Sequence, residues 1–194
     1  MPRAGLDTAA VVRRARELVD ADGVQALTLA RLASELGVAT PSLYKHIGGL
    51  EDLLNRVAAE VTRDMADSMG KASRGRSGRD GLAAVAGAFR RFALEHPGTY
   101  PLTQRRLDTE EWQAAAGDAI ASVAAALSGY GVEEADVDRI RYVRSALHGF
   151  VDLELSGGFG LPDPVDRSFD FLVDALDATL SPLPARETAP PTRS

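Results

Sequence analysis

The chain has 194 residues and contains no cysteine. Disulfide bonds and thiolate metal sites are therefore excluded, and a reducing compartment is permitted rather than proven. No segment approaches the roughly 18 uninterrupted apolar residues of a membrane-spanning helix. The first ten residues, MPRAGLDTAA, also lack the apolar stretch of a signal peptide. We therefore expect a cytoplasmic protein with no membrane partner.

Histidine is also scarce, with three residues, His46, His96 and His148, that form no His-x-x-x-His pair. Without cysteine, they offer no set of metal ligands. The sequence shows no glycine-rich phosphate loop and no nucleophile elbow. We therefore expect no metal, no cofactor and no enzymatic activity. One enzymatic alternative stays open, because His148 and Asp152 stand at i, i+4 and could transfer a proton, although such a pair is more often an ion pair at a surface or interface.

What the chain does contain is a helical pattern. Hydrophobic residues make up 45% and charged residues 26%, which is ordinary for a globular protein. The length allows one or two domains with a proper core. Apolar residues recur at helical spacing, and neither a β-pattern nor an internal repeat is visible. The sequence predicts an all-α fold.

The net charge of −6 is unevenly distributed along the chain. Residues 1–46 hold six Lys/Arg and five Asp/Glu, a balance of +1, and the remaining 148 residues hold 16 basic and 23 acidic residues, a balance of −7. DNA phosphates would repel the acidic part, so only the N-terminal part suits nucleic acid. This asymmetry predicts a small DNA-reading head on a larger body with another task.

The stretch from 27 to 46, LTLARLASELGVATPSLYKH, predicts two short helices joined by a tight turn. Thr28 is a good N-cap for the first helix. Gly37 ends that helix, since glycine takes the left-handed conformation that a helix C-terminus needs. Thr40 is expected to cap the second helix, with Pro41 in its first turn. This is the anatomy of a helix-turn-helix.

The second helix of this stretch is unusually polar for its length. Ser42, Tyr44, Lys45 and His46 surround Leu43, so most of its surface offers hydrogen-bond donors, an aromatic ring and a cation. In a helix-turn-helix this helix enters the major groove of DNA. The plainer alternative is a helical hairpin with a solvated polar face, or a helical scaffold that binds protein rather than DNA. The confined basic charge favours DNA.

The remainder of the chain predicts a first helix, a long fourth helix and a helical body. Residues 70–79, GKASRGRSGR, are expected to be a flexible loop, and the proline-rich residues 181–194 a disordered tail. The helix at 133–155 is expected to be the longest. The helices are expected at 8–22, 50–69, 81–95, 110–128, 133–155 and 163–180, with a short turn or helix at 101–106.

The sequence resembles the TetR family of transcriptional regulators across nearly its whole length. The segment LTLARLASELGVATPSLYKHIGGLEDLL resembles the family's three-helix head and the start of its fourth helix. The segment RSALHGFVDLELSGGFG resembles the subgroup whose C-terminal domain bears a Trp-His-Gly signature, although Leu147 replaces its tryptophan. The expected domains are a helix-turn-helix head at 1–49, a connecting helix at 50–70, an effector-binding and dimerisation body at 80–180 and a tail at 181–194.

The resemblance implies a homodimer that binds a pseudo-palindromic double-stranded operator and an unknown small-molecule effector, most simply as a repressor released by that effector. It implies phosphate contact by Thr28, base-edge contact by Thr40, Pro41 and Ser42, and phosphate or thymine-methyl contact by Tyr44, Lys45 and His46. An effector pocket is expected among Phe89, Phe92, Tyr100, Trp112, Tyr142 and His148. A dimer interface is expected at Phe150, Leu153, Phe169, Leu172 and Leu176.

The head departs from the family pattern at two positions. Ala30 stands where some members have a base-reading arginine, and Leu50 where many have a phosphate-binding lysine. Fewer charged contacts imply weaker non-specific affinity and a shallower dependence of binding on salt. Sequence reading would then rely more on apolar and hydroxyl contacts.

Overall fold

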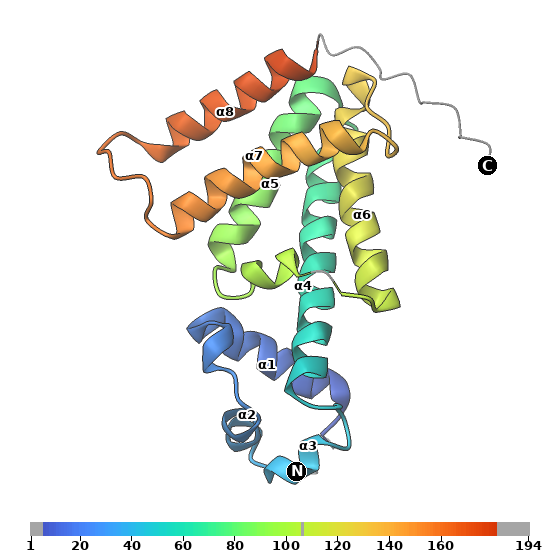
Figure 1. The fold of residues 1–194 in the computed structure, drawn as a ribbon, viewed down its shortest axis with the longest axis vertical. Helices are drawn as coiled ribbons and strands as arrows, with labels where there is room; N and C mark the ends of the chain where they lie inside the picture. The colour runs from blue at the N-terminus through green and yellow to red at the C-terminus, as the bar shows by residue number, and fades with distance from the viewer. Residues whose placement is uncertain (1–5, 106, 182–194) are drawn as a thin grey trace, which may run out of the picture.

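The structure, a computed structural model, describes residues 6–105 and 107–181, and over these ranges it is built of helices without a strand, which confirms the all-α prediction. A small N-terminal head lies below a larger helical body, and one long helix runs between them (Figure 1). The head holds α1 (Thr8–Asp22), the 3₁₀ turn η1 (Val24–Ala26), α2 (Leu29–Leu36) and α3 (Thr40–Leu43). No helix in the described ranges is long and apolar enough to cross a membrane.

The head is held together by a compact apolar core, and side chains cap α1 and α2. Val11, Leu32 and Leu43, one from each helix, are fully buried. Thr28 accepts a hydrogen bond from the Arg31 amide at 3.1 Å, and Gly37 ends α2 with φ of 68°, so both sequence predictions are confirmed. The predicted cap at Thr40 is wrong. Ala39 occupies that position and no side chain caps α3, because the chain enters the helix one residue earlier.

The connecting helix α4 (Leu50–Ser73) is the longest in the described part, with 24 residues. It begins beside the head and ends deep in the body (Figure 1). Two predictions are therefore wrong: the helix at 133–155 is not the longest, and of the loop predicted at 70–79, residues 70–73 belong to α4 and residues 78–79 to α5 (Gly78–Glu95). Apolar residues extend along α4 as far as Met69 and Ala72, which pack in the core and continue the helix past the predicted break.

The body surrounds the upper part of α4. It holds α5 (Gly78–Glu95), η2 (Tyr100–Gln104), α6 (Glu110–Leu127), η3 (Ser128–Tyr130), α7 (Val137–Leu155) and α8 (Val165–Leu180). α7 begins four residues later than predicted, where the Asp136 carboxylate accepts a hydrogen bond from the Arg139 amide at 3.3 Å. α7 and α8 pack together at the edge of the body (Figure 1). Beyond Ser181 the expected disordered tail lies outside the described residues.

Candidate nucleic-acid interface and body cavity

The residues predicted to contact DNA lie together at the end of the head. Thr28, Pro41, Tyr44 and Lys45 are exposed, and the Tyr44 ring is 60% exposed. The other three, Thr40, Ser42 and His46, are half-buried. All belong to the start of α2 or to α3 and the turn that follows it.

Two buried side chains hold this polar segment in place. Leu43 is fully buried and Ile47 is 4% exposed. The Ile47 amide donates to the Leu43 carbonyl at 3.1 Å, and the Thr8 hydroxyl donates to the His46 carbonyl at 3.3 Å. Because Leu43 and Ile47 anchor the segment in the core, Tyr44 and Lys45 between them point outward.

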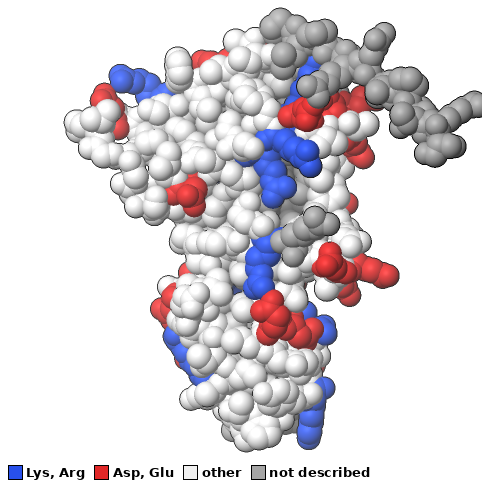
Figure 2. Space-filling view, in the orientation of Figure 1, with Lys and Arg blue, Asp and Glu red and all other residues white. Residues whose placement is uncertain are grey.

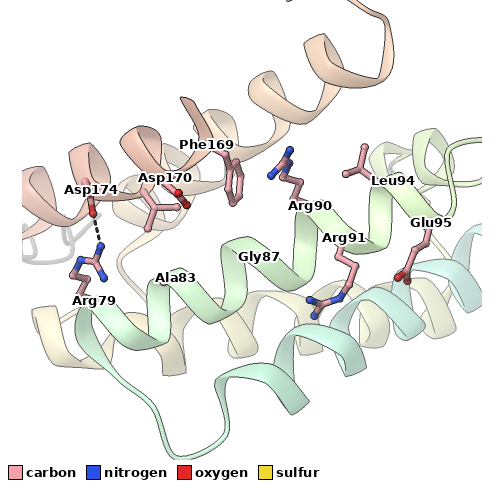
Figure 3. Close-up of a pocket in the computed structure, with 11 residues that line it drawn as sticks. Arg79, Ala83, Gly87, Arg90, Arg91, Leu94, Glu95, Phe169, Asp170 and Asp174 are labelled. Carbon is pink, nitrogen blue, oxygen red and sulfur yellow. Dashed lines mark hydrogen bonds and ion pairs between the residues drawn. The ribbon is translucent and has the colours of Figure 1, made fainter. Parts of the chain in front are cut away.

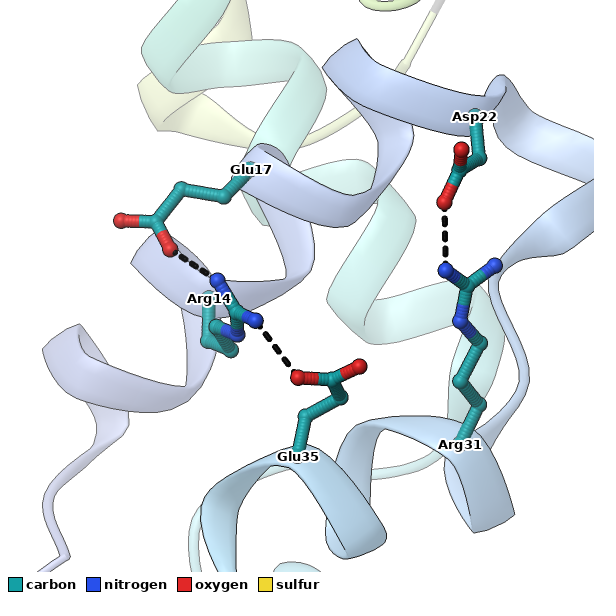
Figure 4. A network of polar contacts seen from close by, with 5 residues as sticks. All are labelled: Arg14, Glu17, Asp22, Arg31 and Glu35. Carbon is teal, nitrogen blue, oxygen red and sulfur yellow. Dashed lines mark hydrogen bonds and ion pairs between the residues drawn. The ribbon is translucent and has the colours of Figure 1, made fainter.

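Most arginines of the head are already paired with acids. Arg14 bridges α1 and α2, with its guanidinium 2.7 Å from Glu17 and 2.6 Å from Glu35, and Arg31 pairs with Asp22 (Figure 4). Exposed pairs of this kind contribute little to stability. They do occupy cations that phosphate would otherwise attract.

Lys45 is the exception among the positive charges near α3. It has no ion-pair partner among the described residues and is exposed. On the face shown in Figure 2, the end of the molecule near α3 carries few charged groups. The arrangement offers one free cation, hydroxyls and an aromatic ring to a nucleic acid, rather than a dense basic patch.

The body contains a cavity of about 240 Å³ enclosed by α4, α5, α6, α7 and η2. Its wall is mainly apolar, with Met65 and Met69 from α4, Phe89 from α5, Val123 from α6 and Leu147 from α7. An apolar pocket with few polar groups is typical of small-molecule sites.

Five polar side chains interrupt the apolar wall of this cavity: Thr62, Thr103, Trp112, Arg144 and His148. The Thr103 hydroxyl is already bonded, because it donates to the Tyr100 carbonyl at 2.8 Å and accepts from the Gln104 side-chain amide at 2.8 Å. The Thr62 hydroxyl oxygen and the Trp112 indole Nε1 are buried and have no hydrogen-bond partner among the described residues. Thr62 is only 3% exposed. Buried polar atoms without a partner are rare in folded proteins and costly, so each needs an explanation.

His148 is tied to the turn that leads back to the head. Its Nδ1 lies 2.5 Å from the Tyr100 hydroxyl, and its ring packs edge-on against Phe89 with centroids 4.7 Å apart. Burial, and to a smaller extent the Arg144 charge, lowers the pKa of His148 to about 4. His148 is therefore neutral at physiological pH. Burial also raises the pKa of the Tyr100 hydroxyl, which stays protonated.

Three of the six residues predicted for the effector pocket line this cavity in the structure. Phe89, Trp112 and His148 line the cavity, and Tyr100 lies behind His148 through the hydrogen bond just described. Phe92 does not line it and packs against His96, with ring centroids 4.8 Å apart.

Tyr142 also lies elsewhere, because its position on α7 points away from the cavity. It is 43% exposed and its hydroxyl lies 3.0 Å from the Thr179 hydroxyl of α8. Helical spacing alone did not show which face of α7 lines the cavity. The polar lining residues that sequence reasoning missed are Thr62, Thr103 and Arg144. For Thr62, the available signal was a hydroxyl residue at a core-facing position of α4.

The enzymatic alternative requires contact between His148 and Asp152. No hydrogen bond or ion pair joins these two side chains in the described structure. The Nδ1 atom of His148 is bonded to Tyr100, and its lowered pKa makes it a poor proton acceptor near neutral pH. Among these residues, no group of three or more His, Cys, Asp or Glu could hold a metal ion.

A second, more open hollow of about 900 Å³ lies between α5 and α8 (Figure 3). Two of its three cations are paired: Arg79 lies 2.5 Å from Asp174, and the Arg90 guanidinium binds Glu154 through two hydrogen bonds of 2.7 and 2.6 Å. These ion pairs connect α5 to α7 and α8.

The residues predicted for the dimer interface differ in how exposed they are in one chain. Phe169 and Leu176 are 6% and 1% exposed and belong to the core of one chain, so they are not available to a second copy. Phe150 and Leu172 are half-buried, and Leu153 is 47% exposed. The most exposed apolar side chains on this side are Leu161 at 78% and Phe171 at 74%, which sequence reasoning left out.

A polar seam joins the body to the head at residues 96–100. His96 Nδ1 lies 2.7 Å from the Asp20 carboxylate of α1, and the Thr99 hydroxyl donates to the same carboxylate at 3.0 Å. A Cβ atom at Gly98 would lie 2.1 Å from the Val19 carbonyl oxygen. Only glycine allows this close an approach, so the turn lies directly on the end of α1.

Known proteins carry the same two parts. Residues 11–57 match the model of the bacterial regulatory proteins of the tetR family, and residues 82–176 match that of the tetracyclin repressor-like C-terminal domain. An uncharacterised helix-turn-helix-type transcriptional regulator of Mycobacterium tuberculosis is 38% identical over 159 residues, which cover 79% of this chain and 72% of that protein. The chain belongs to the TetR family.

This TetR-family chain is a DNA-binding transcriptional regulator. The tetracycline repressor protein class D of Escherichia coli is 33% identical over 117 residues, 57% of this chain and 53% of that protein. The crystal structure of a TetR variant from Acinetobacter baumannii in complex with minocycline has a TM-score of 0.65 at 24% identity, covering 90% of this chain and 96% of that one. At that identity the likeness shows the shared fold.

Proposed function

We propose that this TetR-family regulator acts in the cytoplasm as a homodimeric repressor, and that a small effector bound in the body cavity releases it from its operator. The observation that carries the proposal is a continuous physical path between the cavity and the DNA-facing residues. His148 in the cavity wall binds Tyr100, whose neighbours Thr99 and His96 bind Asp20 of the head.

The long helix α4 supports the same path from the other side. Thr62, Met65 and Met69 of α4 line the cavity, and its first turn lies directly after the segment that carries Tyr44 and Lys45. A ligand that moves these cavity residues would tilt α4 and shift the seam on α1 together. Such a ligand changes DNA affinity only if it prefers one position of the head over another.

The homodimer supplies the second requirement for sequence-specific binding. Leu153, Leu161 and Phe171 are exposed apolar side chains on α7, on α8 or in the segment between these helices. Exposed apolar patches often mark interaction sites, and we propose that these side chains belong to the dimer interface. Two heads related by a two-fold axis would meet major-groove segments about 34–36 Å apart, and would therefore read a pseudo-palindrome.

The proposal is tested by recovering the genomic fragments that the purified protein binds, and then titrating the tightest fragment against the protein. We expect a pseudo-palindromic site whose affinity exceeds that of unrelated DNA by at least about 1,000-fold at physiological salt. Comparable affinity for unrelated DNA of the same length would contradict specific operator binding.

A further inference from the structure

Three of the five polar side chains that line the body cavity, Trp112, Arg144 and His148, offer hydrogen-bond donors at neutral pH. The Trp112 indole N–H can only donate. The Arg144 guanidinium carries five donors and no acceptor. Arg144 has no ion-pair partner among the described residues, and it is exposed at the edge of the cavity that it helps to line.

His148 has the tautomer that makes it a donor as well. The one hydrogen-bond partner of the Tyr100 hydroxyl in the described structure is His148 Nδ1, at 2.5 Å. A buried hydroxyl needs an acceptor for its proton, so Tyr100 donates and Nδ1 accepts. Because burial keeps the imidazole neutral, the ring proton resides on Nε2. The Thr62 hydroxyl can donate or accept, so it adapts to whatever faces it.

From this donor set we propose that the cavity binds a small apolar molecule that carries one carboxylate or a comparable oxyanion. The oxyanion lies at the Arg144 side, where it forms a charge-assisted hydrogen bond with the guanidinium. The apolar part lies among Met65, Met69, Phe89 and Leu147. An oxygen of the same ligand accepts from Trp112 Nε1, which otherwise has no partner.

The size and wall of the cavity restrict the ligand further. Its volume of about 240 Å³ lies just below the usual range of roughly 300–1,000 Å³ for ligand pockets. A large multi-ring molecule or a nucleotide would not fit. A cationic ligand would face Arg144 with no acid among the lining residues to balance its charge. The inference deepens the proposed function, since it names the chemical class of the effector.

The chain provides its own probe for this test, because Trp112 is the single tryptophan in the sequence and it lines the cavity. We would titrate the protein with octanoate and 1-octanol, and with 4-propylbenzoate and 4-propylbenzyl alcohol, and follow Trp112 fluorescence and heat of binding. Each pair keeps the apolar part and exchanges the carboxylate for a neutral hydroxyl. The apolar part is a flexible chain in the first pair of compounds and a flat ring in the second.

We expect at least one carboxylate to bind about tenfold or more tightly than its alcohol, as a charge-assisted hydrogen bond implies. Arg144→Gln should remove that preference while leaving affinity for the alcohol within about twofold. Arg141→Gln is the matched control, because Arg141 is an exposed arginine of the same helix that does not line the cavity. It should leave all four affinities unchanged.

Three results would overturn the inference: equal binding of acid and alcohol, an unchanged preference in Arg144→Gln, or no binding by any of the four compounds. Its failure differs from failure of the proposed function. A carboxylate that binds in the cavity without changing operator affinity contradicts effector-controlled release and leaves the ligand class standing. A neutral compound that releases operator while no carboxylate binds contradicts the ligand class alone.

Discussion

The head and the cavity treat their polar groups in opposite ways. In the head, Arg14, Arg16 and Arg31 are each paired with an acid of the same chain. In the cavity, the Thr62 hydroxyl and the Trp112 indole are buried without a partner. A buried unsatisfied polar group costs about 1–3 kcal/mol. Retaining two of them beside one apolar cavity indicates a site that is completed by something outside the chain.

The head presents few unpaired cations to DNA phosphates. Its paired arginines fix α1 against α2 and leave Lys45 as the free cation beside Tyr44. Most sequence-independent DNA affinity comes from cations on phosphates. A head with few of them should depend on shape, hydroxyl and aromatic contacts, and should show a shallow dependence on salt.

The largest effect is expected where the two regions meet. Gly98→Val should destabilise the protein by about 3 kcal/mol or more, because the new side chain would overlap the backbone carbonyls at the end of α1. Thermal or urea unfolding measures this change. Gly87→Val is the control, since a Cβ at Gly87 meets nothing within 4 Å and the same substitution should change stability by less than about 1 kcal/mol. Equal effects would mean that the close approach at Gly98 is not required.

The next largest effect concerns assembly. Phe171→Glu should weaken the dimer by about 100-fold. Phe171 is 74% exposed in one chain, and the substitution would replace an aromatic ring of the proposed interface with a charge. Sedimentation at micromolar concentration measures the change. Leu94→Glu removes another exposed apolar side chain, on α5, and should leave the dimer intact. A dimer that survives Phe171→Glu would place the interface elsewhere.

A smaller effect is expected on DNA binding. Tyr44→Ala and Lys45→Ala should each lower operator affinity by about 5- to 50-fold without unfolding the head, since both side chains are exposed. Loss of the Lys45 phosphate contact should also reduce the slope of log affinity against log salt by about one unit. Lys71→Ala removes the same charge near the far end of α4 and should leave the slope unchanged. If the slope of log affinity against log salt were the same in all variants, Lys45 would not contact a DNA phosphate.

The smallest effect is the pH dependence of stability that arises from His148. Its pKa in the folded protein is lowered to about 4, below the ordinary value of 6.5, so the unfolded chain takes up the proton first. The stability from neutral His148 is fully present above pH 6.5 and is lost as pH falls towards 4. His148→Gln should flatten this part of the stability profile. A wild-type profile that matches the variant's between pH 6.5 and 4 would show that His148 titrates normally.

Much of the head could be predicted from sequence because its signals are local. The Thr28 cap and the Gly37 stop depend on residues three or four positions away, and both predictions are confirmed. The signal for the cap of α3 was weaker, and the predicted cap residue was wrong. Thr40 competes with Ala39 for the cap position one residue apart, and no side-chain hydrogen bond distinguishes them in the sequence.

The cavity and the seam could not be derived in the same way, because they depend on contacts between distant segments. Tyr100 meets His148, which is 48 positions away, and Asp20 meets His96, which is 76 positions away. Helical periodicity shows that Phe169 and Leu176 face inward together, but not whether the inside belongs to one chain or two. The structure places both in the core of one chain, and the exposed Phe171 beside them was passed over.

The central claim is that the cavity and the DNA-binding face share one conformational equilibrium. Its most direct test is the affinity of a cavity ligand, octanoate or the tightest compound from a small-molecule screen, measured with and without saturating operator DNA. We predict that operator weakens the ligand by about 5- to 150-fold, that the ligand weakens operator by the same factor, and that Asp20→Asn reduces both. Ligand affinities that are equal with and without operator would contradict the claim.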